Sequence, residues 1–126
     1  MKLENIKFKA KRLDNGEWVC GYFYEENSNT YIIENRQKES MLNRNVTYEV
    51  DPSTVCQFTG MKDKNGTPIY EGDVAIYKNN NAERRGVIVW DNESIAFCFG
   101  KSFLLCHFPS KNMVVVGNKF DKENSV

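Results

Sequence analysis

The sequence has little of what metal sites and catalytic sites are usually built from. Its 126 residues include one histidine, His107, and no two of its four cysteines are separated by only two residues. A structural zinc site usually takes two ligands from one tight turn, so this spacing argues against such a site. We therefore predict a protein without a metal or a cofactor. The cysteines are Cys20, Cys56, Cys98 and Cys106.

The cysteines also lack the pattern of a disulfide framework or of a reactive thiol. Scattered cysteines in a reducing compartment are most often small, buried apolar residues. Cys106 precedes His107, but neighbouring residues of a strand point to opposite faces, so the two side chains would not readily share a proton. We expect four free thiols that pack as core residues.

Several motifs typical of enzymes are missing. There is no Gly-x-Gly-x-x-Gly loop, no lysine loop for nucleotide phosphates, no nucleophile elbow and no pair of histidines. Basic and acidic residues balance at 17 each, so no overall field draws the protein to nucleic acid or to a membrane. We predict a protein without enzymatic activity.

Long apolar runs are absent as well. No stretch approaches the roughly 18 consecutive apolar residues of a membrane-spanning helix. Residues 1–5, Met-Lys-Leu-Glu-Asn, lack the apolar block of a secretion signal. These features are typical of a soluble cytoplasmic protein with no membrane partner.

Helical periodicity is scarce, whereas apolar and polar residues alternate in many short stretches. Ile6, Phe8 and Ala10 alternate with lysines, as in a strand with one buried face. Short strands at close spacing are typical of β-barrels and β-sandwiches, so we predict an all-β protein. The expected strands cover residues 6–11, 18–24, 30–34, 46–50, 55–61, 69–70, 74–77, 86–90, 95–99, 103–108 and 113–116, and we expect the last of them to be buried.

Two polar stretches are predicted to be loops. In Asn35–Asn45 the only strong apolar residues, Met41 and Leu42, stand side by side and make no helical stripe. Lys78–Arg85 consists of asparagines, charged residues and one alanine. We expect the asparagines at 79–81 to form a flexible loop tip.

The densest turn chemistry lies in Thr54–Tyr77. Asn65 and Gly66 both accept the positive φ that a tight hairpin needs, and Pro68 delays the start of the next strand. A second corner follows at residues 71–73, Glu-Gly-Asp. There the glycine permits a bend, and the aspartate can accept hydrogen bonds from nearby backbone.

This segment resembles the core signature of the YopX family, small proteins encoded by phages, prophages and mobile elements. The likeness covers residues 55–66 and 69–74, and residues 6–10 and 115–118 resemble the opening and closing strands of that family. The resemblance implies a mostly β protein and carries over no established activity. The signature positions are Gly60, Asp63, Asn65, Gly66, Tyr70, Glu71, Gly72 and Asp73.

The order of the predicted elements favours two subdomains. Residues 1–53 are predicted to form a β-meander, and residues 54–120 resemble an SH3-like barrel. Residues 121–126 are a charged tail that we expect to fray. Sheet edges and aromatic faces on a small chain also favour self-association into a homo-oligomer.

Two groups of charged residues are candidate sites. Asp63, Glu71 and Asp73 could hold a cation or act as acid and base, although we favour a structural role for each in a turn. A basic group on the first strand could bind nucleic-acid phosphates beside aromatic residues that stack on bases. The basic residues are Lys7, Lys9, Lys11 and Arg12, with Arg84 and Arg85 as candidates to join them, and the aromatic residues are Trp18, Tyr22 and Tyr24.

The alternative interpretation of the lysines is protection of an exposed sheet edge against pairing with another chain. We favour it, because the overall charge is balanced and the lysines follow the strand period. Replacing the three lysines by glutamine should then leave partner binding intact and promote aggregation. The sequence thus predicts a phage-derived binding module for a host or phage protein, with nucleic acid as the alternative ligand.

Overall fold

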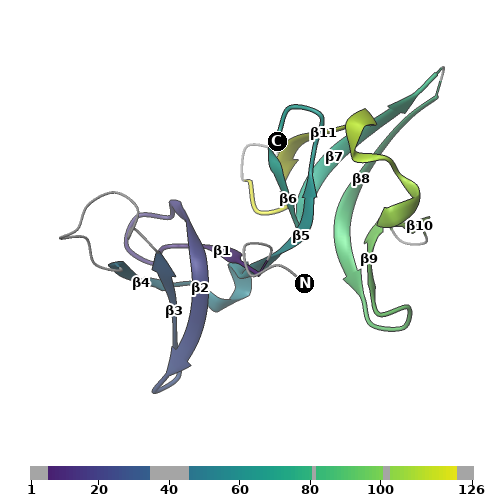
Figure 1. Cartoon of the computed structure of the whole chain (residues 1–126). Coiled ribbons are helices and arrows are strands. Elements are labelled where there is room, and N and C mark those ends of the chain that lie inside the picture. Colours follow the sequence, from purple (N-terminus) through teal and green to yellow (C-terminus); the bar gives the residue numbers. More distant parts are fainter. Residues whose placement is uncertain (1–5, 35–45, 81, 101–102, 122–126) are drawn as a thin grey trace. The chain divides into compact units, whose positions relative to one another are not determined.

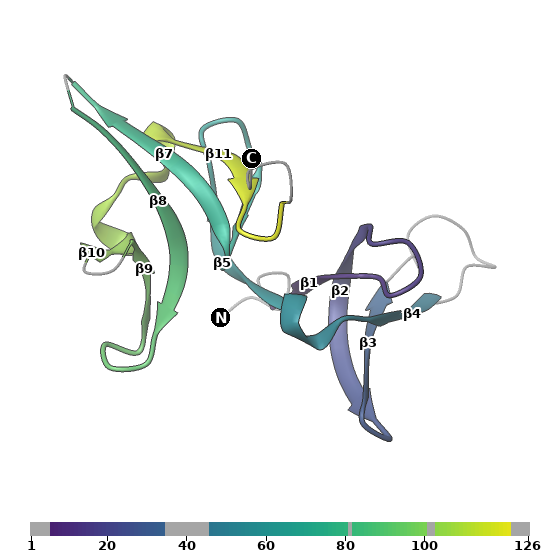
Figure 2. The same cartoon turned by 180° about the vertical axis from the view of Figure 1, so that it is seen from behind.

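The computed structural model describes residues 6–34, 46–80, 82–100 and 103–121. Over these residues the chain forms antiparallel β-strands and three short 3₁₀ turns, with no α-helix, so the all-β prediction is confirmed. The chain divides into two compact units, Met1–Gln57 and Phe58–Val126, whereas the sequence placed a boundary between residues 53 and 54. In Figure 1 the first unit runs from purple to teal and the second from teal to yellow, and Figure 2 shows them from behind.

The first sheet contains six strands in the order β4-β3-β2-β1-β5-β6. The first two residues of β5 pair with β1, and its later residues pair with β6. All pairs are antiparallel, as is usual for strands joined by short turns. The strands are β1 (Phe8–Lys11), β2 (Trp18–Glu26), β3 (Asn29–Glu34), β4 (Val46–Val50), β5 (Cys56–Lys62) and β6 (Pro68–Tyr70).

The second sheet contains five strands in the order β10-β9-β8-β7-β11. β7, β8 and β9 form a meander, and β11 returns to pair with β7. Among the described residues no ladder joins β10 to β11, so the sheet is open. The strands are β7 (Asp73–Asn79), β8 (Ala82–Asp91), β9 (Ala96–Phe99), β10 (Phe103–Leu104) and β11 (Met113–Asn118); the 3₁₀ turns are η2 (Pro52–Thr54), η3 (Leu105–His107) and η4 (Ser110–Asn112).

Turn residues with unusual φ connect the strands. Asn27 and Ser28 have φ of 54° and 71° and join β2 to β3 as a tight hairpin. In the turn after β5 only Gly66 has a positive φ, 84°, and Asn65 does not, contrary to the prediction. β6 already begins at Pro68, because proline is tolerated at the first position of a strand.

The polar stretch Lys78–Arg85 is not a loop, contrary to the prediction. β7 and β8 extend into it and pair with each other almost to the tip, where Asn80 turns the chain with a φ of 54°. Both faces of this hairpin end are largely exposed, so its residues need no apolar alternation. The strands are held by their backbone ladder, and Lys78 and Glu83 form an exposed ion pair at 3.7 Å.

The first unit buries one face of its strands around small apolar residues. Phe8, Tyr48 and Val55 pack against this core. The N–H of Leu13, just after β1, donates to the Glu49 carbonyl at 3.1 Å. The end of β1 thus joins β4, and the curved sheet encloses the core. The buried residues are Ala10, Val19, Ile32 and Val50.

The second unit has a larger core that includes aromatic rings. Phe108 lies edge-on to Tyr77 and to Phe99, with ring centroids 5.0 and 4.9 Å apart. Apolar burial is the dominant favourable term in folding, so this cluster carries much of the unit's stability. The buried residues are Ile69, Ala75, Ile88, Phe99, Leu105 and Met113.

The cysteines match the prediction in part. All four are free thiols, but only Cys56 and Cys98 are buried, whereas Cys20 and Cys106 are exposed. Cys106 and His107 lie in the 3₁₀ turn η3. The expectation that they alternate between the faces of a strand is therefore wrong.

The end of the described chain is bonded rather than frayed. β11 runs past Val116 to Asn118, whose N–H donates to the Asp121 carboxylate at 2.8 Å. The Asp121 N–H donates back to the Asn118 carbonyl at 3.0 Å. The rest of the predicted tail and the predicted loop Asn35–Asn45 lie outside the described residues.

Candidate functional site

The three lysines around β1 lie on the outer face of the first sheet. Phe8 and Ala10 pack in the core, so the alternating Lys7, Lys9 and Lys11 face away from it. β1 pairs with β2 on one side and with β5 on the other, so it is not an edge strand. Edge protection is therefore the wrong interpretation. Alternation shows that one face of a strand is buried and does not show whether its backbone is paired on both sides.

Lys9 and Lys11 both place their ammonium groups over the ring of Trp18. The Nζ atoms lie 4.8 Å and 5.5 Å from the ring centroid. Lys11 is the direct cross-strand partner of Trp18, and Lys9 reaches it diagonally from its place opposite Cys20. Cation–π contacts at exposed sites contribute about 0.5–1 kcal/mol each. Two positive charges are thus held in place on the sheet surface.

Arg12 does not extend this row of lysines. Its guanidinium lies 4.4 Å from the ring centroid of Tyr48, a residue that packs against the core. It also donates two hydrogen bonds to the Asp14 carboxylate. This hydrogen bonding raises the pKa of Arg12 and lowers that of Asp14. The guanidinium of Arg12 therefore contacts Tyr48 and Asp14 of its own unit.

Tyrosine rings continue the outer face beyond Trp18. Tyr24 stacks on Tyr31 of β3 with ring centroids 5.0 Å apart. Tyr22 and Tyr24 are 45% and 37% exposed. Positive charge and aromatic surface therefore share one face of the sheet. We call it the basic aromatic face; it comprises Lys7, Lys9, Lys11, Trp18, Tyr22, Tyr24 and Tyr31.

The two arginines proposed to join the lysines belong to the second unit. Both lie on β8, where the guanidinium of Arg84 is 4.6 Å from the ring centroid of Phe103. Arg85 is the cross-strand partner of Ile76 on β7. We therefore do not count Arg84 and Arg85 in the basic aromatic face.

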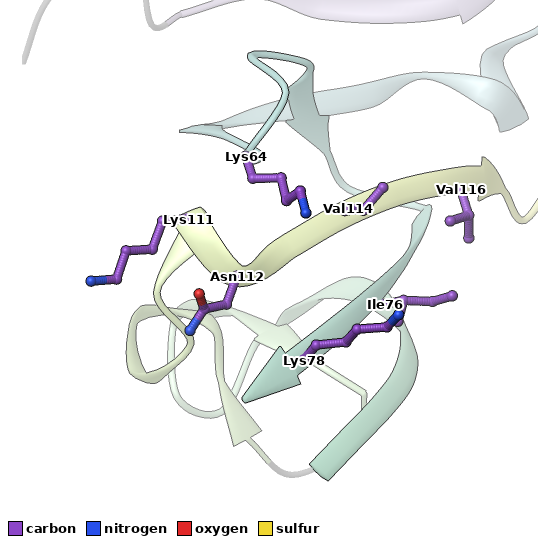
Figure 3. A pocket seen from close by; sticks show the side chains of 7 residues that line it. All are labelled: Lys64, Ile76, Lys78, Lys111, Asn112, Val114 and Val116. Carbon is purple, nitrogen blue, oxygen red and sulfur yellow. The ribbon is translucent and has the colours of Figure 1, made fainter. Parts of the chain in front are cut away.

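A second basic surface lies in the second unit (Figure 3). A hollow of about 280 Å³ opens over β7 and β11, beside the turn between β5 and β6. Figure 3 shows Lys64 reaching over β11 and Lys78 lying along β7 toward Ile76. The sequence did not predict this site. We call it the lysine hollow; its lining residues are Lys64, Ile76, Lys78, Lys111, Asn112, Val114 and Val116.

Asp63 is buried beneath the turn between β5 and β6 and accepts three backbone hydrogen bonds. Its Oδ1 accepts from the N–H groups of Asn65 and Thr67, and its Oδ2 accepts from Val115 on β11, each at 2.9 Å. Burial by itself raises the pKa of Asp63, but these N–H groups together lower it below its ordinary value. The carboxylate ties the turn to β11.

Asp73 performs a similar task at the second corner. Its Oδ2 accepts from the Tyr70 N–H at 2.8 Å, and its Oδ1 accepts from the side-chain amide of Asn118 at 3.0 Å. Between Tyr70 and Asp73, Gly72 bends the chain with a φ of 93°, and the Gly72 N–H donates to the Ile88 carbonyl at 2.7 Å. Both aspartates therefore act as links between backbone segments.

A family model described as YopX protein matches residues 7–125, nearly the whole chain. The chain belongs to the YopX family. The resemblance seen in the sequence is confirmed. No curated protein and no solved structure matches the chain.

Of the remaining YopX signature positions, Tyr70 is a buried residue at the end of β6, and the other two lie at bends. Gly60 has a φ of 89° within β5, where the register with β6 shifts, and Glu71 is a half-buried residue of the second corner. Within the described ranges, no three His, Cys, Asp or Glu side chains gather as a metal ion would require. The same residues include no helix long and apolar enough to cross a membrane.

The lysine hollow of this YopX-family chain had almost no signal in the sequence. Its lysines come from a turn, from the end of β7 and from η4, which are separate segments of the chain. They meet because β11 returns to β7. Residues 113–116 are all apolar, so their sequence shows no alternation that would separate a buried face from an exposed one. The prediction of a fully buried strand there is wrong for Val116, which is 46% exposed.

Proposed function

We propose that this YopX-family chain is a non-catalytic binding module that holds single-stranded nucleic acid on the basic aromatic face. The observation that carries this proposal is the pair of ammonium groups over Trp18, beside the exposed rings of Tyr22 and Tyr24. Surfaces that bind single strands combine positive charges along the phosphates with aromatic rings on which bases stack.

The place of β1 in the sheet favours nucleic acid over a protein as the ligand. Edge protection would explain the lysines without any phosphate contact, but β1 is an inner strand and has no open edge to protect. Lysine is depleted at protein–protein interfaces, whereas lysine beside aromatic rings suits a nucleic-acid strand. The chain as a whole has no net charge, so the affinity must come from this local surface.

Fluorescence anisotropy with a labelled oligothymidylate tests the proposal. With about three phosphate contacts, the affinity should fall about tenfold between ~50 and ~150 mM salt. Replacing Lys7, Lys9 and Lys11 together by glutamine should weaken binding by at least about tenfold, because three phosphate contacts are lost. Tyr22→Ala should weaken it about tenfold through the loss of one stacking platform.

A matched control removes three lysines from the other unit. The triple replacement of Lys64, Lys78 and Lys111 by glutamine takes away the same charge from the lysine hollow and should leave oligothymidylate binding unchanged. Equal losses in the two triple variants would show that binding follows net charge alone. Unchanged binding in the variant of the basic aromatic face would contradict the proposal.

A protein of the host or of the phage is the second candidate ligand. The observation that favours it is the lysine hollow, whose apolar floor is unlike a nucleic-acid surface. A pull-down from a host lysate treated with nuclease separates the two candidates, because a protein partner remains bound after nucleic acid is removed. We place this activity in the cytoplasm of a cell that carries a phage or prophage, in keeping with the YopX resemblance.

We also propose an SH3-like arrangement for residues 54–120. The meander β7, β8 and β9 with β11 returning to β7 supports it. Because the sheet is open in the described residues, the proposal concerns strand order and curvature, not closure. An experimental structure in which these strands follow the order and curvature of SH3 domains would support it, and a different order would reject it.

Self-association is a further proposal, supported by two exposed aromatic rings of the second unit, Trp90 and Phe103, which are 40% and 46% exposed. Such rings would be covered if two copies met. Light scattering over a range of micromolar concentrations measures it. A single species of 14.6 kDa at all of them would reject it.

A further inference from the structure

We propose that the lysine hollow binds an acidic protein segment that inserts an aliphatic side chain between the lysines. This site lies in the second unit and is separate from the nucleic-acid function proposed for the first. The proposal specifies the chemistry of the protein partner, which was the second candidate ligand above.

Two hydrogen bonds to the backbone of β11 hold the turn between β5 and β6 against this strand. The Lys64 N–H donates to the Met113 carbonyl at 3.0 Å, and the Asp63 carboxylate accepts from the Val115 N–H at 2.9 Å. At the other end the turn η4, which carries Lys111, leads directly into β11. The hollow is therefore formed before a ligand arrives, which reduces the entropy lost on binding.

The charges around the hollow select an anionic ligand. Three of its seven lining residues are lysines and none is acidic. Lys78 has an ion pair with Glu83 at 3.7 Å, in which the two side chains are 71% and 60% exposed. Exposed ion pairs of this kind contribute little, so Lys78 can exchange Glu83 for a carboxylate of the ligand. A ligand with two or more carboxylates matches this rim.

The floor distinguishes a peptide from a phosphate or a nucleic acid. Ile76 and Val114 are cross-strand partners, and Val116 is 46% exposed beside them. A phosphate would bury none of this aliphatic surface, and bases stack on aromatic rings, which the lining lacks. An aliphatic side chain flanked by carboxylates covers the floor and meets the rim. The Asn112 amide can both donate to and accept from a peptide bond.

Nuclear magnetic resonance on the whole chain tests the proposal. The probe is a blocked peptide that alternates glutamate and leucine. The methyl resonances of Ile76, Val114 and Val116 should shift and saturate with a Kd on the order of 0.1 mM, since a hollow of this size holds few ligand atoms. A peptide that shifts no methyl resonance of the hollow up to several times that concentration overturns the proposal.

Variants locate the binding. Replacing Lys64, Lys78 and Lys111 together by glutamine should weaken binding of the peptide at least about tenfold. Val116→Ser should weaken it about threefold through lost apolar contact. Lys62→Gln, an exposed lysine of β5 outside the hollow, should leave it unchanged. An equal effect of the control and the triple variant would also overturn the proposal.

Comparison ligands separate the sources of negative charge. The same peptide with glutamine in place of glutamate should bind at least about tenfold more weakly. Inorganic phosphate and oligothymidylate should not displace the acidic peptide. Equal binding of the glutamine peptide, or displacement by phosphate, contradicts a carboxylate-specific site. The variant of Lys7, Lys9 and Lys11 should keep the peptide shifts, so a failure of the nucleic-acid proposal remains distinguishable from a failure here.

Discussion

The two units differ in how fully their cores bury aromatic residues. In the second unit Phe99 and Phe108 pack with Tyr77 in or against the core. In the first unit the buried core cluster is aliphatic, Phe8 and Tyr48 are only partly buried against it, and Tyr22 and Tyr24 are exposed on the sheet. Aromatic side chains bury the largest areas, so the second unit uses them for stability and the first leaves them available to a ligand.

Each unit also contains one of the two tryptophans, which allows the contrast to be measured. Trp18 belongs to the first unit and Trp90 to the second. Replacing either one by phenylalanine leaves the other as a fluorescence reporter of a single unit. A change in the free energy of unfolding can then be assigned to the unit in which it occurs.

The largest effect is expected for Phe99→Ala in the second unit. Phe99 is 1% exposed, so its truncation should lower the free energy of unfolding by about 3–5 kcal/mol. Urea denaturation followed by Trp90 fluorescence measures it. Tyr24→Ala, read through Trp18, is the matched variant and should cost about 1 kcal/mol, the value of its stacking on Tyr31. Similar losses in both variants would remove the contrast between the units.

A close backbone approach in the first unit gives the second prediction. A Cβ added at Gly21 would lie 2.0 Å from the Ile33 carbonyl oxygen, so Gly21→Ala must push β3 away from β2. We expect a loss of about 3 kcal/mol, the upper end of the usual range for overpacking, in urea denaturation followed by Trp18. Gly16→Ala is the control, because Gly16 has a φ of 74° and no atom within 4 Å of an added Cβ.

Gly16→Ala should cost only about 1 kcal/mol, the strain of a left-handed backbone. If Gly21→Ala lowered the free energy of unfolding by no more than this control, the contact between β2 and β3 would be looser than described. Trp90 fluorescence in the same experiment shows whether the second unit is affected.

The third prediction concerns the buried carboxylate of the YopX signature. In Asp63→Asn the oxygen can still accept from Asn65 and Thr67, but the new NH₂ group then faces the Val115 N–H. Two donors facing each other should cost about 1–3 kcal/mol at neutral pH, measured by urea denaturation through Trp90. Glu71→Gln is the control, because Glu71 is a half-buried acidic residue of the second corner, and it should have a smaller effect.

The pH dependence of the same variant follows from the lowered pKa of Asp63. Because the folded-state pKa lies below the unfolded value, the carboxylate stabilises the fold above the unfolded pKa of about 3.9. This stabilisation is lost as the pH falls through the folded pKa. The difference between the natural protein and Asp63→Asn should therefore shrink in acid. A difference that is constant from pH 7 to pH 2 would contradict this account.

The smallest effect on stability is expected on the basic aromatic face. Replacing Lys9 and Lys11 by glutamine removes two exposed cation–π contacts with Trp18 and should cost about 1 kcal/mol or less. Trp18 fluorescence should change even so, because the charges beside the ring are gone. A loss of several kcal/mol would show that the lysines serve the fold rather than a ligand.

Local rules predicted most of the strands and turns of this protein. The alternation in residues 6–11 and 46–50 identified strands that the structure contains as β1 and β4. The rules failed in Lys78–Arg85, where a hairpin is exposed on both faces and its residues carry no alternation. They also failed for Val116, which lies in a strand but on its exposed face.

The sequence by itself determined the all-β class, most turns and the YopX family, because alternation, glycine and proline act within a few residues. Tertiary structure alone decided that β1 is an inner strand, which turned its lysines from edge protection into a candidate binding face. It also decided that Lys64, Lys78 and Lys111 share one hollow. Both depend on pairing between strands distant in sequence, and such pairing is set by how whole faces pack together.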